Sequence, residues 1–334
     1  MPLVNAKCTN CGANLQVDNT KDAAICQYCG SAYIVEKAVN NYNTVNNIHA
    51  SVVNIYGGNS ADFVIRGGIL EKYNGASTHV VIPNSVCYIG EGVFQNCHEL
   101  KSVTIPDSVT TIGPSAFENC YALKSVTILN SVTTIGNSAF ENCYALKSVT
   151  IPNSVTTIGH YAFRGCRSLE SITVPFGVIH IQSAAFMGCQ NIKIVNLPDS
   201  ITTMDIYAFA DCTSLERITL PKGLSVLERS VFKNCTSLSS IVIPKGTRFQ
   251  MNSLWGEYGE YGTFRNCSRL TNVIAEDANA EIPNEHFVGT PWLEQRREKE
   301  KMDWRNNGKC DLCGGSFRGL IVKKCSKCGK NKQY

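Results

Sequence analysis

One phrase of alternating apolar and polar residues recurs along most of the chain. It is clearest in three consecutive segments, which read SVTIPDSVTTIGPSAFENCYALK (102–124), SVTILNSVTTIGNSAFENCYALK (125–147) and SVTIPNSVTTIGHYAFRGCRSLE (148–170). The repeat length is therefore 23 residues. Periods of roughly 20–50 residues are typical of repeat arrays in which each unit stacks on the next and buries a continuous core. The pattern predicts a solenoid.

A phenylalanine followed three residues later by a cysteine marks the same point of each unit. Successive pairs are 23 residues apart, except for one interval that contains nine additional residues. In the last pair a threonine takes the place of the cysteine, so nine units are indicated. The pairs are Phe94/Cys97, Phe117/Cys120, Phe140/Cys143, Phe163/Cys166, Phe186/Cys189, Phe209/Cys212, Phe232/Cys235, Phe264/Cys267 and Phe287/Thr290. We expect these cysteines to be small buried packing residues rather than metal ligands or disulfide partners.

The first part of a unit has the pattern of a half-buried strand. In residues 100–106 (LKSVTIP), apolar and polar residues alternate after the first leucine, so Val103 and Ile105 are expected to point inward. Gly113 then permits a turn, and a helical or 3₁₀ turn is expected to close the unit. The remaining inward residues of this unit are predicted to be Val109, Ile112, Phe117 and Cys120.

These units resemble those of the BspA-like subfamily of leucine-rich-repeat proteins, which read IP..V..I...AF..C..L. The resemblance covers about residues 60–293 and implies a β-rich leucine-rich-repeat solenoid with short strands. Residues 62–75 resemble the hairpin that covers the first unit in such proteins, and Thr290, followed by Pro291 and Trp292, resembles the closing cap. The family also implies the recognition of proteins by surface-displayed molecules.

Two sets of four cysteines flank the repeats. Each set has two C-x₂-C motifs, separated by fourteen residues in the first set and by eleven in the second. Four such thiolates form the tetrahedral Cys₄ shell that is typical of structural zinc, and redox-active dithiol pairs are the alternative. We therefore expect two structural zinc ions in two zinc ribbons, one bound by Cys8, Cys11, Cys26 and Cys29 and the other by Cys310, Cys313, Cys325 and Cys328.

Charge is uneven along the chain. The formal net charge is +4, but residues 294–334 carry twelve Lys/Arg against five Asp/Glu, a difference of +7. The basic C-terminal ribbon therefore offers a contact for nucleic-acid phosphates, although lysines on so small a domain are also expected simply as a solvated surface.

Neither a membrane span nor an export signal is predicted. No run of eighteen apolar residues occurs, and the start, MPLVNAKCTNC, lacks the basic segment and apolar run of a signal peptide. Both sets of cysteines fit a reducing compartment, since neither needs disulfides. We expect a cytoplasmic protein.

Catalysis is not expected. The six histidines show no spacing suited to metal binding or to a nucleophile–base pair. Neither a phosphate-binding glycine loop nor a G-x-S-x-G motif is present in the sequence. The sequence predicts that the protein is not an enzyme.

The outward positions of the predicted strands are candidates for a partner surface. They are Ser or Thr throughout residues 102–173, whereas later units present varied residues such as Asn196 and Arg217. Recent internal duplication would also produce the early uniformity without any ligand. The later half is therefore the better candidate for binding a protein partner.

A second candidate surface is the insertion that lengthens one unit, around residues 249–262. It contains Trp255, Tyr258 and Tyr261 among Gly and Glu residues. These aromatic side chains either fold back over the core or anchor a protein partner.

The predicted organisation has five parts, and the predicted function is a non-catalytic scaffold for protein–protein interaction. Nucleic-acid binding by the C-terminal ribbon and an exported surface adhesin are the alternatives. The parts are a zinc ribbon (1–37), an Asn-rich linker (38–60), the solenoid with its hairpin and cap (61–293), a charged helical linker (294–309) and a second zinc ribbon (310–334).

Overall fold

The computed structural model describes residues 62–250, 262–277 and 282–307, together with residues 309 and 327 and the backbone of short strands elsewhere. The chain divides into two compact units, Met1–Ile55 and Tyr56–Tyr334. The first unit contains two antiparallel hairpins. Their strands are β1 (Leu3–Lys7) with β2 (Asn14–Asp18), and β3 (Ala23–Ile25) with β4 (Ala32–Ile34).

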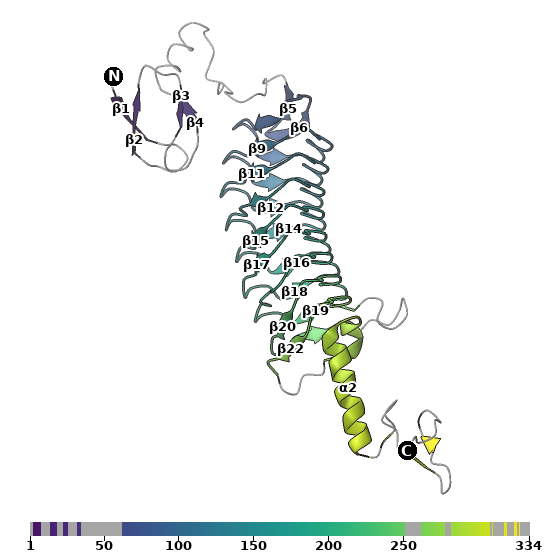
Figure 1. Cartoon of the computed structure of the whole chain (residues 1–334). Helices are drawn as coiled ribbons and strands as arrows, with labels where there is room; N and C mark the ends of the chain where they lie inside the picture. Colours follow the sequence, from purple (N-terminus) through teal and green to yellow (C-terminus); the bar gives the residue numbers. More distant parts are fainter. Residues whose placement is uncertain are drawn as a thin grey trace. The chain divides into compact units, whose positions relative to one another are not determined.

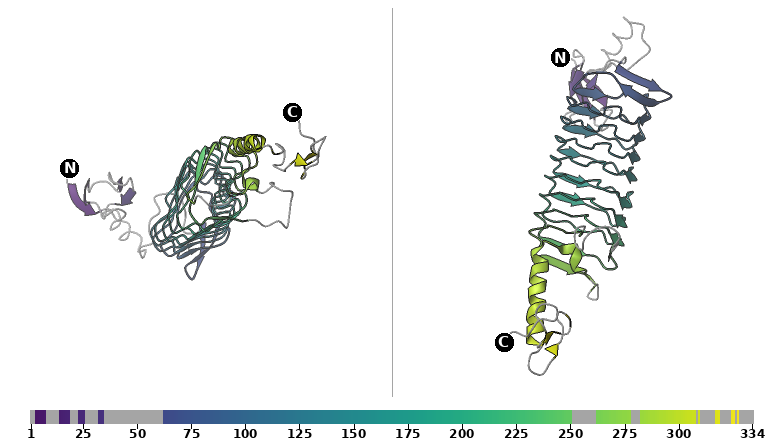
Figure 2. Two further views of the ribbon diagram at one scale, coloured as in Figure 1. Left: turned by 90° about the horizontal axis from the view of Figure 1, so that it is seen from below. Right: turned by 90° about the vertical axis from the view of Figure 1, so that its right-hand side faces the viewer.

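The second unit is dominated by a β-solenoid, whose coils stack along one axis (Figures 1 and 2). Two ladders of parallel strands run along it, each divided into separate sheets, and the paired strands are in register at the repeat spacing, as in Ser102↔Ser125 and Ile112↔Ile135. The first ladder comprises β7 (His79–Val81), β9 (Ser102–Thr104), β11 (Ser125–Thr127), β13 (Ser148–Val149), β15 (Ser171–Thr173), β17 (Ile194–Asn196), β20 (Ser240–Ile243) and β22 (Asn272–Ala275). The second comprises β8 (Tyr88–Ile89), β10 (Thr111–Ile112), β12 (Thr134–Ile135), β14 (Thr157–Ile158), β16 (His180–Ile181), β18 (Thr203–Met204), β19 (Val226–Leu227) and β21 (Arg248–Phe249).

The predicted inward residues form the core. Val103 is 2% exposed, and Ile105, Val109, Ile112 and Phe117 are fully buried. The nine phenylalanines of the repeat stack into one column, with neighbouring ring centroids 4.9 to 5.8 Å apart. Each interval between two successive rings of the column is one complete coil. Nine rings have eight such intervals, so the array is a solenoid of about eight turns.

The third side of each coil corrects the expectation of a helical or 3₁₀ turn. Ser115 and Asn119 have φ values of 50° and 58°, in the left-handed region that interrupts a right-handed helix. Backbone N–H groups on this side alternate in where they donate. Those of Ser115, Phe117 and Asn119 donate to carbonyls of the next coil, whereas those of Ala116 and Glu118 donate to carbonyls of the same coil. Because every second backbone N–H on this side bonds to the next coil, this side of each interior coil forms a series of turns instead of a continuous helix.

The last coil behaves differently, and it supports this explanation. It has no following coil to receive its N–H groups, and its residues Asn284–Phe287 form the 3₁₀ helix η2. A 3₁₀ helix satisfies the same donors locally, by bonds between residues three apart. The change of conformation on this side thus coincides with the absence of a following coil.

A glycine in each early coil allows the backbones to approach closely. A Cβ atom added to Gly113 would lie 2.5 Å from the carbonyl oxygen of Ile89 in the preceding coil. Gly113 does not have a positive φ, so it is required here by the close approach rather than by a left-handed turn.

The solenoid is covered at both ends. The expected N-terminal hairpin is present as antiparallel β5 (Phe63–Arg66) and β6 (Ile69–Tyr73), and the Tyr73 ring lies 4.9 Å from Phe94. At the other end, the Trp292 ring lies 4.6 Å from Phe287. The aromatic column is therefore closed by Tyr73 and Trp292.

The expected charged helix is α2 (Pro291–Asn306). Thr290 is its N-cap, because its hydroxyl accepts the N–H of Leu293 at 3.2 Å and donates to the carbonyl of Phe287 at 2.8 Å. Beyond α2, the short strands β23 (Phe317–Arg318) and β24 (Lys324–Cys325) pair antiparallel.

Candidate functional site

The outward side chains of the first ladder form what we call the strand face, and the early and late coils differ on it. The early coils present exposed hydroxyls, as at Ser125 and Thr127. In the late coils, Ile194 is 57% exposed, and Val242 and Ile274 are 42% and 48% exposed. Val242 and Ile274 are paired across β20 and β22, so they lie side by side. The late coils thus carry an apolar surface that the early coils lack.

Two predicted site residues lie on this face. Asn196 is exposed and donates through its side-chain amide to the hydroxyl of Thr173 at 3.1 Å. Arg217 holds the position equivalent to Ile194 in the next coil, which forms no strand there, and it is also exposed. The structure therefore places Asn196 and Arg217 on the same surface as Ile194. The other predicted partner residues, Trp255, Tyr258 and Tyr261, lie outside the described residues.

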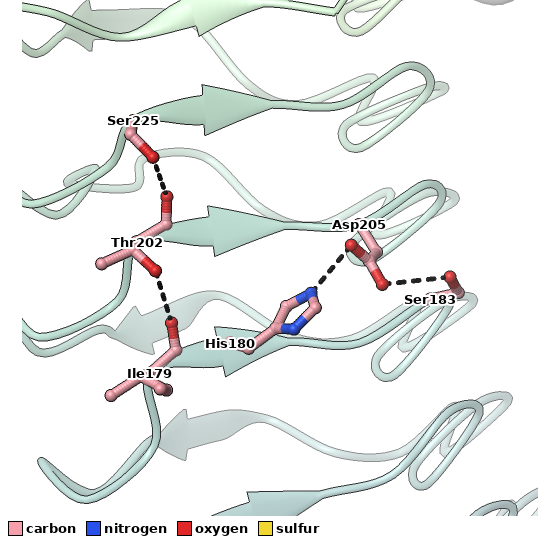
Figure 3. Close-up of polar contacts among 6 residues, drawn as sticks. All are labelled: Ile179, His180, Ser183, Thr202, Asp205 and Ser225. Carbon is pink, nitrogen blue, oxygen red and sulfur yellow. Dashed lines mark hydrogen bonds and ion pairs between the residues drawn. The ribbon is translucent and has the colours of Figure 1, made fainter.

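A polar cluster lies on the outer side of the second ladder (Figure 3). His180 Nε2 lies 2.8 Å from Asp205 Oδ1, and the hydroxyl of Ser183 donates to Asp205 Oδ2 at 3.4 Å. The imidazole and the hydroxyl thus both bind the carboxylate instead of each other. A serine activated by a base needs a direct contact between the two, so this trio does not form a nucleophile–base pair.

A second carboxylate follows in the next coil. Glu228 occupies the position of Asp205 one repeat later, and burial raises the pKa of Glu228, with the charge of Asp205 adding to the increase. The neighbouring Thr202 and Ser225 continue a ladder in which each hydroxyl donates to a carbonyl of the preceding coil, at 3.3 and 3.0 Å. The cluster is a local feature of the late coils.

An aromatic ladder that the sequence reasoning missed lies at a corner of the early coils. The rings of His98 and Tyr121 stack at 4.6 Å, those of Tyr121 and Tyr144 stack at 4.9 Å, and the guanidinium of Arg167 lies 4.4 Å from the Tyr144 centroid. These residues are spaced by 23, so the repeat register contained the signal. Because neighbours cover both faces of each tyrosine ring, only the ring edges and hydroxyls face solvent.

One coil also exposes two apolar side chains at a turn between the ladders. Phe176 is 75% exposed and Ile179 is 61% exposed. Their counterparts in the preceding coil are Asn153 and Thr156. The substitution is confined to one turn and lies directly before His180, at the boundary between the early and late coils.

The repeat cysteines are buried, as expected for packing residues. Seven of them lie at 0% exposure, and each thiol donates to the carbonyl of a phenylalanine in the preceding coil, as in Cys143 to Phe117 at 3.3 Å. Burial raises the pKa of these thiols, to about 12 at Cys267. They stay protonated, so they are poor nucleophiles and poor metal ligands.

The described residues hold neither a metal-binding group nor a membrane helix. No cluster of three or more His, Cys, Asp or Glu side chains suited to a metal ion occurs among them. None of the described helices is long and apolar enough to cross a membrane. The cysteines of the two predicted zinc ribbons have side chains outside the described part of the chain.

The two ladders, the buried Phe/Cys columns and the capped ends define a leucine-rich-repeat solenoid. The family described as "BspA type Leucine rich repeat region (6 copies)" matches residues 72–192 and 133–258, which together exceed half of the chain. The chain belongs to the BspA-type leucine-rich-repeat family. The expected resemblance is thereby confirmed for the solenoid.

Solved structures of leucine-rich-repeat proteins match the chain at modest similarity. One from Bacteroides ovatus is 24% identical with a TM-score of 0.49, covering 73% of this chain and 80% of that chain. One from T. pallidum is 26% identical with a TM-score of 0.42, covering 47% and 90%. One from Eubacterium ventriosum is 28% identical with a TM-score of 0.44, covering 58% and 50%. No significant relative is found among curated proteins.

Proposed function

We propose that this protein is a non-catalytic scaffold that binds a protein partner through the late strand face. The observations that carry the proposal are the exposed apolar side chains of Ile194 and of the paired residues Val242 and Ile274, with Arg217 in a coil between them. Exposed apolar patches mark protein-interaction sites, and arginine is enriched among the residues that carry most of the binding energy there.

The architecture supports this function physically. A solenoid presents a long surface for its mass, and its outward residues change without altering the packing between coils. Membership of a leucine-rich-repeat family is consistent with a role in protein interaction. The Ser183–Asp205–His180 arrangement itself does not form a nucleophile–base pair.

A matched pair of surface variants tests the proposal. Full-length protein is used as bait in lysate, and the captured partner is titrated by surface plasmon resonance. The double variant Ile194→Asp/Arg217→Glu should lower the affinity for that partner by more than about tenfold, since it removes an apolar anchor and reverses a charge. The control Ser125→Asp/Lys101→Glu makes the same change of charge on the early strand face and should bind as the parent does. The proposal fails if no partner binds saturably, or if both double variants lose affinity equally.

We further propose that two structural zinc ions stabilise the flanking ribbons. In the first unit, the Cys8–Cys11 pair lies in the connection between β1 and β2, and the Cys26–Cys29 pair lies between β3 and β4. A C-x₂-C turn at the end of a hairpin is the arrangement that a zinc ribbon requires. In the C-terminal part, Cys325 ends β24 of another antiparallel pair.

Metal content and free thiols test the zinc proposal together with the cytoplasmic location. Untagged protein purified without chelator should hold two zinc ions, and all seventeen of its cysteines should react as thiols after unfolding with a chelator, because the eight ligands are reduced. Replacing Cys8 and Cys26 by Ser should remove one ion and leave the solenoid folded. Absence of zinc, with ribbon cysteines oxidised in pairs, would instead favour the exported adhesin.

A further inference from the structure

Charges of alternating sign line one edge of the strand face. The residue directly before the strand position is Lys147, Glu170, Lys193 and Glu216 in four consecutive coils, and all four are exposed. The N–H of Glu170 donates to the carbonyl of Lys147 at 3.1 Å, and that of Lys193 donates to the carbonyl of Glu170 at 2.9 Å. Stacked strands are about 4.8 Å apart. The four residues therefore form a row parallel to the axis, with the signs plus, minus, plus and minus.

The charges of this row are not paired with one another within the described ranges. None of the four side chains takes part in a salt bridge there, although neighbours of opposite sign are one coil apart. In the later coils the same position holds the uncharged Ser239 and Thr271, and in the earlier coils it holds Lys101 and Lys124. The alternation is thus confined to the boundary between the early and late coils.

A row with this order of signs is complementary to a reversed copy of itself. A second copy can meet the strand face in the opposite direction, related by a two-fold axis that passes between the coils of Glu170 and Lys193. Glu170 then faces the partner's Lys193, and Lys147 faces the partner's Glu216. Every charge of the row meets one of opposite sign, whereas sliding the second copy by one coil in either direction brings like charges together.

The centre of this arrangement is apolar. Ile194 follows Lys193 on the outward side of β17 and is 57% exposed. Its coil borders the axis, so the Ile194 side chains of the two copies lie next to each other. Ser171 and Thr173 on the other side of the axis are short and exposed, so they leave room for the isoleucines. An apolar centre with complementary charges at its rim is the usual anatomy of a protein–protein interface.

We propose that the strand face binds a second copy of this chain in this antiparallel arrangement. The inference rests on the proposed function for the use of the strand face, and it specifies the partner. It also accounts for the difference between the two halves of the face, since each early coil then opposes a late one. Val242 faces the partner's Thr127, and Ile274 faces the partner's Thr104. The apolar late positions are thereby covered by threonine side chains.

Sedimentation velocity of the purified full chain over a concentration series tests the inference, and a reversible monomer–dimer equilibrium is expected. The variants Glu170→Lys and Lys193→Glu each place like charges opposite each other on both sides of the axis. Each should weaken dimerisation by about tenfold or more. The double variant Glu170→Lys/Lys193→Glu exchanges the two signs, so it should dimerise within about threefold of the parent.

Mixing the two single variants identifies the contact as one between copies. In the mixed dimer, the Glu170→Lys chain meets the Lys193→Glu chain, and both central pairs again have opposite signs. The mixture should therefore associate about as tightly as the parent, measured by energy transfer between differently labelled chains. Lys124→Glu is the matched control, since it makes the same change of charge in the same row but faces the partner's uncharged Ser239. It should dimerise within about threefold of the parent.

Three results would overturn the inference. They are a purified chain that stays monomeric, a mixture that associates no more tightly than either single variant, and a Lys124→Glu variant that loses as much affinity as Lys193→Glu. Circular dichroism checks that each variant keeps its fold. A monomeric chain that still captures a different protein through Ile194 and Arg217 would overturn this inference and leave the proposed function standing. The proposed function itself fails when Ile194→Asp/Arg217→Glu changes neither capture nor self-association.

Discussion

The coils in residues 102–170 and those in residues 194–275 bury similar side chains but present different surfaces. In both regions the Phe and Cys columns are fully buried. Outside, Ser and Thr beside a row of lysines give way to Ile194, Arg217 and Val242. The interior must match the neighbouring coil on both sides, whereas an outward side chain meets only solvent or a ligand. Differences in binding between the two regions therefore have to come from the outward positions.

The largest expected effect tests whether the two interiors are equivalent. Phe140→Ala in the early region and Phe209→Ala in the late region should each lower the free energy of unfolding by about 3–5 kcal/mol, because both rings are fully buried and stacked on two neighbours. Urea denaturation followed by circular dichroism measures the change. Clearly unequal losses would show that the two cores are packed differently.

Acid should destabilise the late region selectively. Burial lowers the pKa of His286 to about 4, and its Nδ1 lies 2.8 Å from the hydroxyl of Thr263. Between pH 6.5 and 4 the unfolded chain takes up a proton that the folded chain does not, so stability falls by up to about 3 kcal/mol over this range and levels off below it.

Hydrogen exchange in the last coils, measured across this pH range, checks the expectation. His286→Gln should remove most of the slope in these coils, since it cannot take up the proton. The first coils provide the internal control, because their protection should follow the same pH dependence in the parent and in the variant. An unchanged slope in the variant would assign the acid sensitivity to other groups.

A glycine position that differs between the regions should show a smaller effect. A Cβ atom on Gly136 would lie 2.7 Å from backbone atoms of the preceding coil, whereas later coils hold Asp205 and Glu228 at this position. Gly136→Ala should cost about 1–3 kcal/mol, because backbone must shift to admit the methyl group. Asp205→Ala, measured by the same thermal unfolding, should cost less. A negligible cost of Gly136→Ala would mean that the early coils admit the methyl group without a shift of the backbone.

The smallest expected effect concerns the aromatic ladder of the early corner. Tyr121→Ala removes two stacking contacts and should lower stability by about 1 kcal/mol, since the residue is 40% exposed. Tyr121→Phe keeps both ring contacts and should be neutral. Thermal unfolding of the two variants beside the parent distinguishes a stacking contribution from one made by the hydroxyl.

Period and hydrophobic pattern predicted the buried residues because every coil repeats the same environment. The turns around Ser115 and Asn119 were predicted wrongly, since their conformation depends on which carbonyls the next coil offers. The pair His180 and Asp205 was missed because the residues are 25 apart, which is one coil plus two positions. Once the register is known, such offsets become predictable from the sequence.

The direction of the hydrogen bonds on the third side has a consequence for how the gene can change. Each interior coil donates to the following one and accepts from the preceding one in the same way. Removing residues 125–147 in frame would join two coils whose donors and acceptors still correspond, and the end caps would be untouched. Recombination between these near-identical segments can thus lengthen or shorten the solenoid by whole coils without a new fold.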